Sequence, residues 1–161
     1  MKTGFVLKHL FTYWFILMAI LFLTSCNEPE GCNQSTNVFL RMDFYQLEAG
    51  EETSYTLPDL TVYGVTKPDS LIYDDASNLT SINLPLSNAR DQCAFVFVSE
   101  NVYDTISFQY SSELTLLSID CGFINIFNIK KIDANYTLLD SLFIRQPEID
   151  ANEEENVKLY F

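Results

Sequence analysis

Histidine and tryptophan are almost absent from this 161-residue sequence. The one histidine is His9, the one tryptophan is Trp14, and both lie within the first 25 residues. A chain processed after residue 25 would have neither. Histidine is the commonest general base near neutral pH and the commonest metal ligand, so its loss excludes Ser-His-Asp and Cys-His catalysis and histidine-bearing zinc sites. The five glycines form no Gly-rich phosphate-binding loop and no nucleophile elbow.

Basic residues are also scarce, with 9 Lys and Arg against 22 Asp and Glu and a net charge of -13. Residues 1–25 contain two lysines and no acid, so the remaining chain has 9 − 2 = 7 basic residues and a charge of 7 − 22 = -15. This balance excludes a nucleic-acid binder, because phosphate recognition needs a Lys/Arg surface.

A carboxylate pair is the one hydrolytic design that the composition leaves open. The acidic clusters, however, lie in polar, turn-like stretches and are interpreted as solvated surface; they are Glu51-Glu52, Asp74-Asp75 and Glu153-Glu154-Glu155. The sequence therefore predicts a protein that is not an enzyme, with no catalytic residue, no cofactor and no metal ligand set.

The N-terminus has the features of a lipoprotein signal peptide. Lys2 and Lys8 precede a 13-residue apolar run from Phe11 to Leu23, which is shorter than the roughly 20 residues of a membrane-spanning helix. An uncleaved membrane anchor is the alternative. The run ends in Leu23-Thr24-Ser25-Cys26, which resembles a bacterial lipobox. That resemblance implies that residues 1–25 are removed and that lipid on Cys26 anchors the chain to a membrane.

The segment after the lipobox predicts a short tether. Residues 26–36, CNEPEGCNQST, have almost no apolar side chains and include Pro29 and Gly31, so we expect a lipidated tether here and a single domain over residues 37–161. Acidic residues just after the lipidated cysteine resemble surface-export signals of Bacteroidetes lipoproteins, with a partial match at residues 27–30. Exposure on either face of the outer membrane is left open.

The domain itself predicts an all-β fold. Apolar and β-branched runs recur about every ten residues between turns rich in Asn, Asp and Ser, and no long segment has a helical period. This spacing favours an antiparallel, immunoglobulin-like β-sandwich of Greek-key type with about 8–10 strands. Residues 93–99 are expected to form a central strand, and residues 151–156 a hairpin turn before the last strand. The expected strands are 38–45, 54–65, 70–74, 78–87, 93–99, 102–110, 113–120, 122–129, 136–144 and 157–161.

Three cysteines remain besides Cys26, which allows one disulfide and one free thiol. Cys93 opens an apolar strand, where a small buried side chain is expected. Cys32 lies in the tether and Cys121 precedes a strand, so the pair Cys32–Cys121 is favoured. Sequence alone leaves Cys93 open as a partner.

Several of these segments together resemble a family of small Bacteroidetes lipoproteins known only as a domain of unknown function. The segments are Cys26, Cys32, Arg41–Tyr45, Ile82–Ser87, Asp104–Tyr110, Cys121-Gly122 and Lys158–Phe161. The resemblance implies a location in the cell envelope and a β fold, carries no known activity, and favours the pair Cys32–Cys121.

The resemblance to Bacteroidetes proteins also implies O-glycosylation at Asp-Ser/Thr followed by an aliphatic or small residue. Three segments fit this short pattern: Asp69-Ser70-Leu71, Asp104-Thr105-Ile106 and Asp140-Ser141-Leu142. Thr105 and Ser141 lie in expected strands, whereas Ser70 lies near an expected turn. Ser70 is therefore the preferred candidate.

The function expected from the sequence is that of a lipid-anchored envelope lipoprotein acting as an accessory or interaction module, with an envelope protein as its partner. The alternative is a ligand-binding module for glycan or calcium. Nine tyrosines could stack on sugars, and Asp150–Glu154 and Asp133–Asn135 place oxygens at alternate positions. The first of these segments lacks the loop glycine and the final glutamate of a calcium loop, so a solvated turn is favoured for both.

Overall fold

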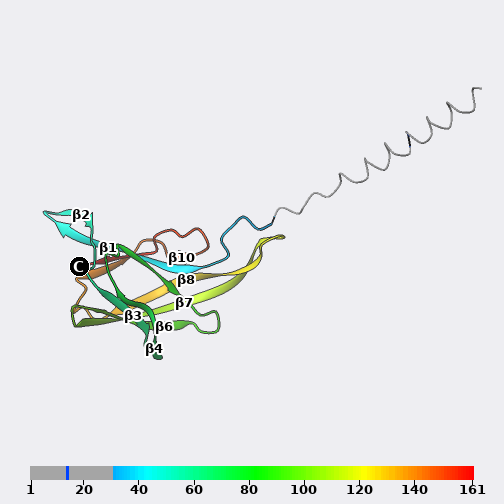
Figure 1. Cartoon of the computed structure of the whole chain (residues 1–161). Coiled ribbons are helices and arrows are strands. Elements are labelled where there is room, and N and C mark those ends of the chain that lie inside the picture. Colours follow the sequence, from blue (N-terminus) through cyan, green and yellow to red (C-terminus); the bar gives the residue numbers. More distant parts are fainter. Residues whose placement is uncertain (1–13, 15–30) are drawn as a thin grey trace, which may run out of the picture. The chain divides into compact units, whose positions relative to one another are not determined.

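The computed structural model of the chain describes Trp14 and residues 31–161 (Figure 1). The predicted signal peptide, the lipobox residues Leu23, Thr24 and Ser25, and Cys26 lie outside the described residues. In the part that is described, no helix is long and apolar enough to cross a membrane. Residues 32–161 form one unit, and the following description concerns that unit alone.

Eleven strands are arranged in two sheets. The first sheet has the order β2-β1-β11-β9, with β5 also paired to β1; its strands are β1 (Phe39–Glu48), β2 (Glu51–Ser54), β5 (Ser81–Pro85), β9 (Ser141–Ile144) and β11 (Val157–Tyr160). The second sheet has the order β10-β8-β7-β6-β3-β4; its strands are β3 (Leu60–Gly64), β4 (Lys67–Ala76), β6 (Gln92–Ser99), β7 (Val102–Ser118), β8 (Gly122–Ala134) and β10 (Glu148–Ile149).

Alternating apolar residues form the core between the two sheets. Leu40, Met42 and Phe44 of β1 are buried, and so are Phe95 and Phe97 of β6. Because successive strand residues point to opposite faces, β1 and β6 each contribute one apolar face to a shared core. The predicted β-sandwich is confirmed, and β6 lies inside its sheet between β7 and β3, as expected for residues 93–99.

The expected break between strands 102–110 and 113–120 is wrong, because β7 is one strand of 17 residues. Ser111, Ser112 and Glu113 are exposed but lie opposite Asn128, Phe127 and Ile126 of β8. The β8 backbone satisfies their hydrogen bonds, so a polar stretch without Gly or Pro continues the strand. β8 likewise runs on to Ala134.

Residues 151–156 do not form the expected hairpin turn. They connect β10 in the second sheet to β11 in the first, where β11 pairs with β1 in parallel. Asn156 explains the crossing, because its buried side-chain amide accepts from Arg41 N at 3.0 Å and donates to the Glu148 carbonyl oxygen at 2.9 Å. A side chain therefore satisfies backbone groups at the point where the chain changes sheets.

Residues 136–140 were expected to begin a strand but form an irregular loop before β9. Asp104 of β7 is completely buried and holds this loop. Its carboxylate accepts the backbone N–H groups of Thr137, Leu138 and Leu139 at 2.8 Å each. The loop amides are thus paired with a side chain in place of a neighbouring strand.

The strand Glu51–Ser54 was missed, because its first two residues are the acidic pair interpreted as a solvated turn. It forms a hairpin with β1 through Ala49 and Gly50, which have φ of 54° and 87°. Positive φ at both central residues is typical of the two-residue turns whose twist suits a hairpin. The first sheet therefore has one more edge strand than the sequence indicates.

Candidate functional site

The disulfide predicted between Cys32 and Cys121 is formed. The two Cα atoms are 4.7 Å apart, and the cysteines are 89 positions apart in the sequence. Closing a loop of this length removes unfolded-chain entropy worth about 4–5 kcal/mol in the chain-entropy model. Cys93, the open alternative, is the free cysteine of the described residues.

The disulfide fixes where the chain leaves the domain. Cys121 lies in the turn between β7 and β8, and its backbone N–H donates to Ser118 Oγ at 2.9 Å. The segment after Cys32 runs beside the tip of this β7–β8 hairpin, seen in Figure 1 as the blue chain next to the yellow turn. The expected tether is therefore fastened to the domain at Cys32, and residues 27–31 are all that separates Cys32 from Cys26.

A groove of about 730 Å³ lies elsewhere on the sandwich, where the β3–β4 hairpin meets the loop between β5 and β6. This volume lies in the range of ligand-binding pockets, roughly 300–1,000 Å³. Apolar walls come from Val65, Ile72 and Leu86, and polar groups come from Ser70 and Gln92. The groove can accept a partly apolar small molecule with several hydrogen-bonding groups.

Two cations distinguish this groove from the rest of the acidic surface. Lys67 and Arg90 both line it and are exposed. In residues 31–161 neither makes an ion pair, whereas four other cations do; these pairs are Arg41–Asp43, Lys131–Asp133, Arg145–Glu155 and Lys158–Glu52. The two groove cations are thus available to an anionic group of a ligand. Sequence alone does not indicate these two residues, since Lys67 and Arg90 come to line one groove only through the fold.

Cys93 lies in the same groove but is not an activated nucleophile. Burial raises the pKa of its thiol to about 11, although hydrogen bonding with Tyr110 opposes this shift. A thiol with a raised pKa stays protonated near neutral pH and is a weak nucleophile. Tyr110 also fixes the groove loop, because its hydroxyl donates to the Ser87 carbonyl oxygen at 3.1 Å and accepts from Ser87 N at 3.2 Å.

The three candidate glycosylation sites differ in their surroundings. Ser70 is exposed on β4 and lines the groove. Ser141 is exposed on β9. Thr105 is half-buried, and the Asp104 side chain before it is occupied by the loop at residues 137–139. The preferred residue, Ser70, is therefore physically accessible to a modifying enzyme.

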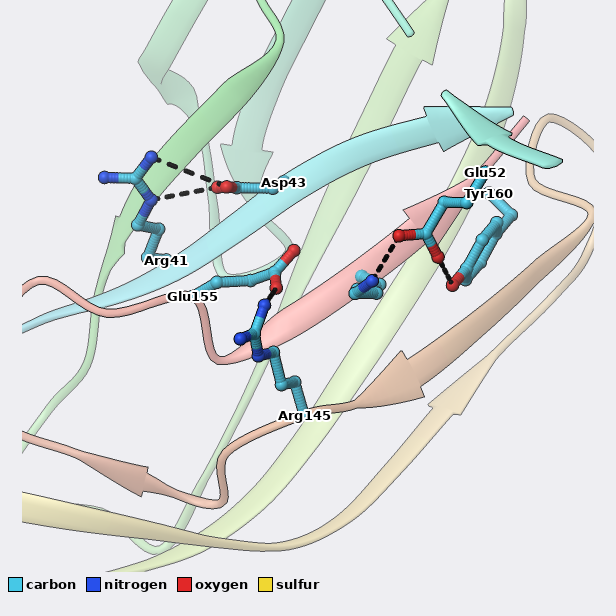
Figure 2. A network of polar contacts seen from close by, with 7 residues as sticks. Arg41, Asp43, Glu52, Arg145, Glu155 and Tyr160 are labelled. Carbon is cyan, nitrogen blue, oxygen red and sulfur yellow. Dashed lines mark hydrogen bonds and ion pairs between the residues drawn. The ribbon is translucent and has the colours of Figure 1, made fainter. Parts of the chain in front are cut away.

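A polar network covers the outer face of the first sheet (Figure 2). Glu52 of β2 accepts from Lys158 and, at 2.6 Å, from the Tyr160 hydroxyl, both on β11. Lys158 Nζ also lies 4.5 Å from the centre of the Tyr45 ring on β1. The hydrogen bonds from Lys158 and Tyr160 lower the pKa of Glu52, while the hydrogen bond to Glu52 raises the pKa of Tyr160 to about 12. Glu52 stays ionised near neutral pH and does not suit the role of a general acid.

The acidic cluster at residues 153–155 is also engaged with a cation. Glu155 accepts from Arg145 at 2.6 Å (Figure 2), and its side chain is only 8% exposed. Burial, and then the nearby Glu155 carboxylate, raise the pKa of the Tyr45 hydroxyl. Two of the three acidic clusters therefore contribute a carboxylate to ion pairs that join strands and loops of the first sheet.

Acidic side chains in both segments considered for calcium already have polar partners in the protein. The Asp150 carboxylate accepts from Asn152 N at 2.9 Å and from Asn152 Nδ2 at 2.7 Å. Asp133 pairs with Lys131 at 2.7 Å. Among residues that the structure describes, no group of three or more His, Cys, Asp or Glu side chains could hold a metal ion.

Two facing sheets, with one disulfide joining the N-terminal segment to a hairpin turn, define a small disulfide-linked β-sandwich domain. The model of a family of unknown function, DUF6452, matches residues 59–161, and the chain belongs to this family. The match covers every residue that lines the groove and also Cys121, but it begins after β1, β2 and Cys32. No curated protein and no solved structure matches the chain.

Proposed function

We propose that the protein is a bacterial cell-envelope lipoprotein whose β-sandwich is anchored by lipid on Cys26 and acts as a non-enzymatic interaction module. The observation that carries this proposal is the lipobox-like Leu23-Thr24-Ser25-Cys26 at the end of an apolar run, followed six residues later by a cysteine bonded to the domain. The resemblance to small Bacteroidetes lipoproteins supports an outer-membrane location.

The short connection limits where the domain can act. Six Cα-to-Cα steps separate Cys26 from Cys32, and a fully extended chain of this length spans about 20 Å. A domain on such a tether stays next to the bilayer. The partner is therefore an envelope protein whose accessible surface lies close to the same membrane.

Fatty-acid labelling tests the anchor. The full chain, tagged at its C-terminus, is grown with an alkyne fatty acid and separated into membrane and soluble fractions. We expect label and membrane association in the wild type and in Cys93→Ser, and no label in Cys26→Ser. Label that persists in Cys26→Ser would contradict the proposal. Mild crosslinking of intact cells then tests for one stoichiometric envelope partner.

The groove favours a second candidate function, the binding of an anionic glycan. Lys67 and Arg90 make no ion pair in the described chain. They line the groove together with apolar side chains, and the volume of the groove suits a small ligand. A thermal-shift titration with oligogalacturonate tests this function. We expect a rise in Tm for the wild type that is lost when Lys67→Gln and Arg90→Gln are combined. The control combines Lys130→Gln and Lys131→Gln, which removes the same charge outside the groove.

A further inference from the structure

The β7–β8 hairpin continues past the rest of the second sheet. β6 pairs with β7 only as far as Gln109, and β10 pairs with β8 only at Phe127 and Asn128. Residues 113–126, called the ribbon below, therefore pair as strands only with each other in the described chain. A two-stranded ribbon with no third strand is marginally stable in water unless something else covers it.

The ribbon exposes large apolar side chains. Leu114, Leu116 and Phe123 are 63%, 51% and 65% exposed, and Ile119 in the turn is 93% exposed. Leu116 and Phe123 are cross-strand partners, and Leu114 lies two residues before Leu116 on the same face. Leu114, Leu116 and Phe123 therefore form one apolar face, and Ile119 lies in the turn at its end; the four residues are called the apolar patch below. Contiguous exposed apolar groups of this kind mark interaction surfaces.

The disulfide places this patch near Cys32, from which the chain leads back to the expected lipid anchor at Cys26. Ile119 and Phe123 each lie two residues from Cys121, which is bonded to Cys32. The connection from Cys32 to Cys26, six Cα-to-Cα steps, reaches about 20 Å at most. The apolar patch consequently lies on the hairpin that the disulfide links to this short connection.

We infer that the tip of the ribbon inserts its apolar side chains into the surface of the bilayer that holds the lipid on Cys26. This inference rests on the proposed lipid anchor and adds a second contact, which fixes the orientation of the domain on the membrane. One lipid anchor leaves a tethered domain free to rotate, whereas an anchor and an apolar tip restrict it. The groove and the outer face of the first sheet are then presented in a defined direction.

The charge of the ribbon specifies the kind of bilayer. Glu113 and Asp120 are its ionisable side chains besides the bonded cysteine, and no Lys or Arg occurs between residues 91 and 129. Anionic headgroups would repel these carboxylates. The contact therefore depends on apolar burial in a zwitterionic surface and is insensitive to salt, unlike a polybasic membrane contact.

Tryptophan fluorescence tests the insertion directly, because residues 26–161 contain no tryptophan. Phe123→Trp and Ile119→Trp place a probe on the tip, at exposed positions where the larger ring meets no packed core. The matched control is Tyr103→Trp, 61% exposed near the other end of β7. Tyr103 precedes Leu116 by 13 residues, which corresponds to roughly 40 Å along a strand.

The full lipidated proteins are reconstituted in phosphatidylcholine vesicles with and without brominated acyl chains. We expect both tip probes to emit at shorter wavelength and to lose most of their emission in brominated vesicles, while the Tyr103→Trp emission is unchanged. Equal, unquenched emission from tip and control probes in vesicle-bound protein would overturn the inference. A tip probe that shifts with rising protein density without bromine quenching would also overturn it, and would indicate a second copy as the occupant.

Two readouts separate this inference from the proposed anchor. Vesicle flotation and the intact mass of each variant report whether Cys26 carries lipid and whether Trp14 has been removed. Absence of acylation contradicts the proposed function. Acylated, floating protein with an unquenched tip probe contradicts the insertion alone.

Discussion

The two halves of β7 follow the same alternation of side chains but lie in different surroundings. Ile106, Phe108 and Tyr110 are between 0% and 3% exposed beneath the first sheet. Leu114 and Leu116, a few residues further along the same strand, are more than half exposed. The alternation determines which side chains share a face, and the tertiary structure determines whether another layer covers that face. An uncovered apolar face next to the predicted anchor is therefore a candidate for contact outside the chain.

The largest expected effect concerns the disulfide that joins the uncovered half to the N-terminal segment. Cys32→Ser should lower the free energy of unfolding by about 4–5 kcal/mol, because it releases a loop of about 90 residues in the unfolded chain. Denaturant titration of the full protein measures this loss. Cys93→Ser is the control and should cost about 1 kcal/mol or less. Equal losses in the two variants would show that the disulfide adds little.

The next prediction compares the two halves directly. Phe108→Ala should cost about 3–4 kcal/mol, because it leaves a cavity in the core. Leu116→Ala should change the free energy of unfolding by no more than about 0.5 kcal/mol in detergent, since its side chain is exposed. A large loss for Leu116→Ala would mean that the ribbon is covered by the chain itself.

Asp104 allows a smaller test on the covered half. Asp104→Asn keeps the shape of the side chain but weakens its hydrogen bonds to the loop at residues 137–139, so we expect a loss of about 2 kcal/mol. Asp133→Asn removes an exposed charge near the end of the neighbouring strand and should cost about 0.5 kcal/mol or less. Similar losses would indicate that the loop amides find other partners.

The smallest effect concerns alkaline pH and the network on the first sheet. The folded-state pKa of Tyr160 is raised to about 12 by Glu52, above the ordinary value of 10.0. The folded state then binds this proton more tightly, so the stabilisation is present below pH 10 and is lost between pH 10 and about 12. Stability measured across this window should fall less in Glu52→Gln than in the wild type. An identical fall in both would contradict the coupling.

The local sequence pattern was sufficient to predict the β-sandwich and the central strand at residues 93–99. It also favoured the disulfide between Cys32 and Cys121. Each depends on features that neighbouring residues carry, such as alternation and the position of cysteines relative to strands. The polar residues Ser111-Ser112-Glu113 led to the wrong prediction of a break within β7. The partner strand β8 supplies hydrogen bonds to them that the local sequence does not indicate.

Long-range placement could not be predicted in the same way. Asp104 and Asn156 are buried polar residues that each bind backbone groups more than 30 positions away, at residues 137–139 and at Arg41, and their burial depends on those distant partners. Lys67 and Arg90 line the same groove although two strands, β4 and β5, occupy most of the sequence between them. The spacing of the two residues in the sequence does not indicate that they lie close together. The exposed face of the ribbon shows the same limit, since the alternation of its side chains is indistinguishable from that of a core strand.

Peptide mapping of the mature protein by mass spectrometry, without reduction, tests the central claim most directly. The claim is that a lipid anchor at Cys26 and a disulfide at Cys32–Cys121 hold the ribbon tip near the membrane. We predict an N-terminal peptide that begins at acylated Cys26, is linked through Cys32 to the peptide containing Cys121, and is accompanied by Cys93 as a free thiol. An unacylated peptide from before Cys26, or a bridge from Cys32 to Cys93, would contradict the account.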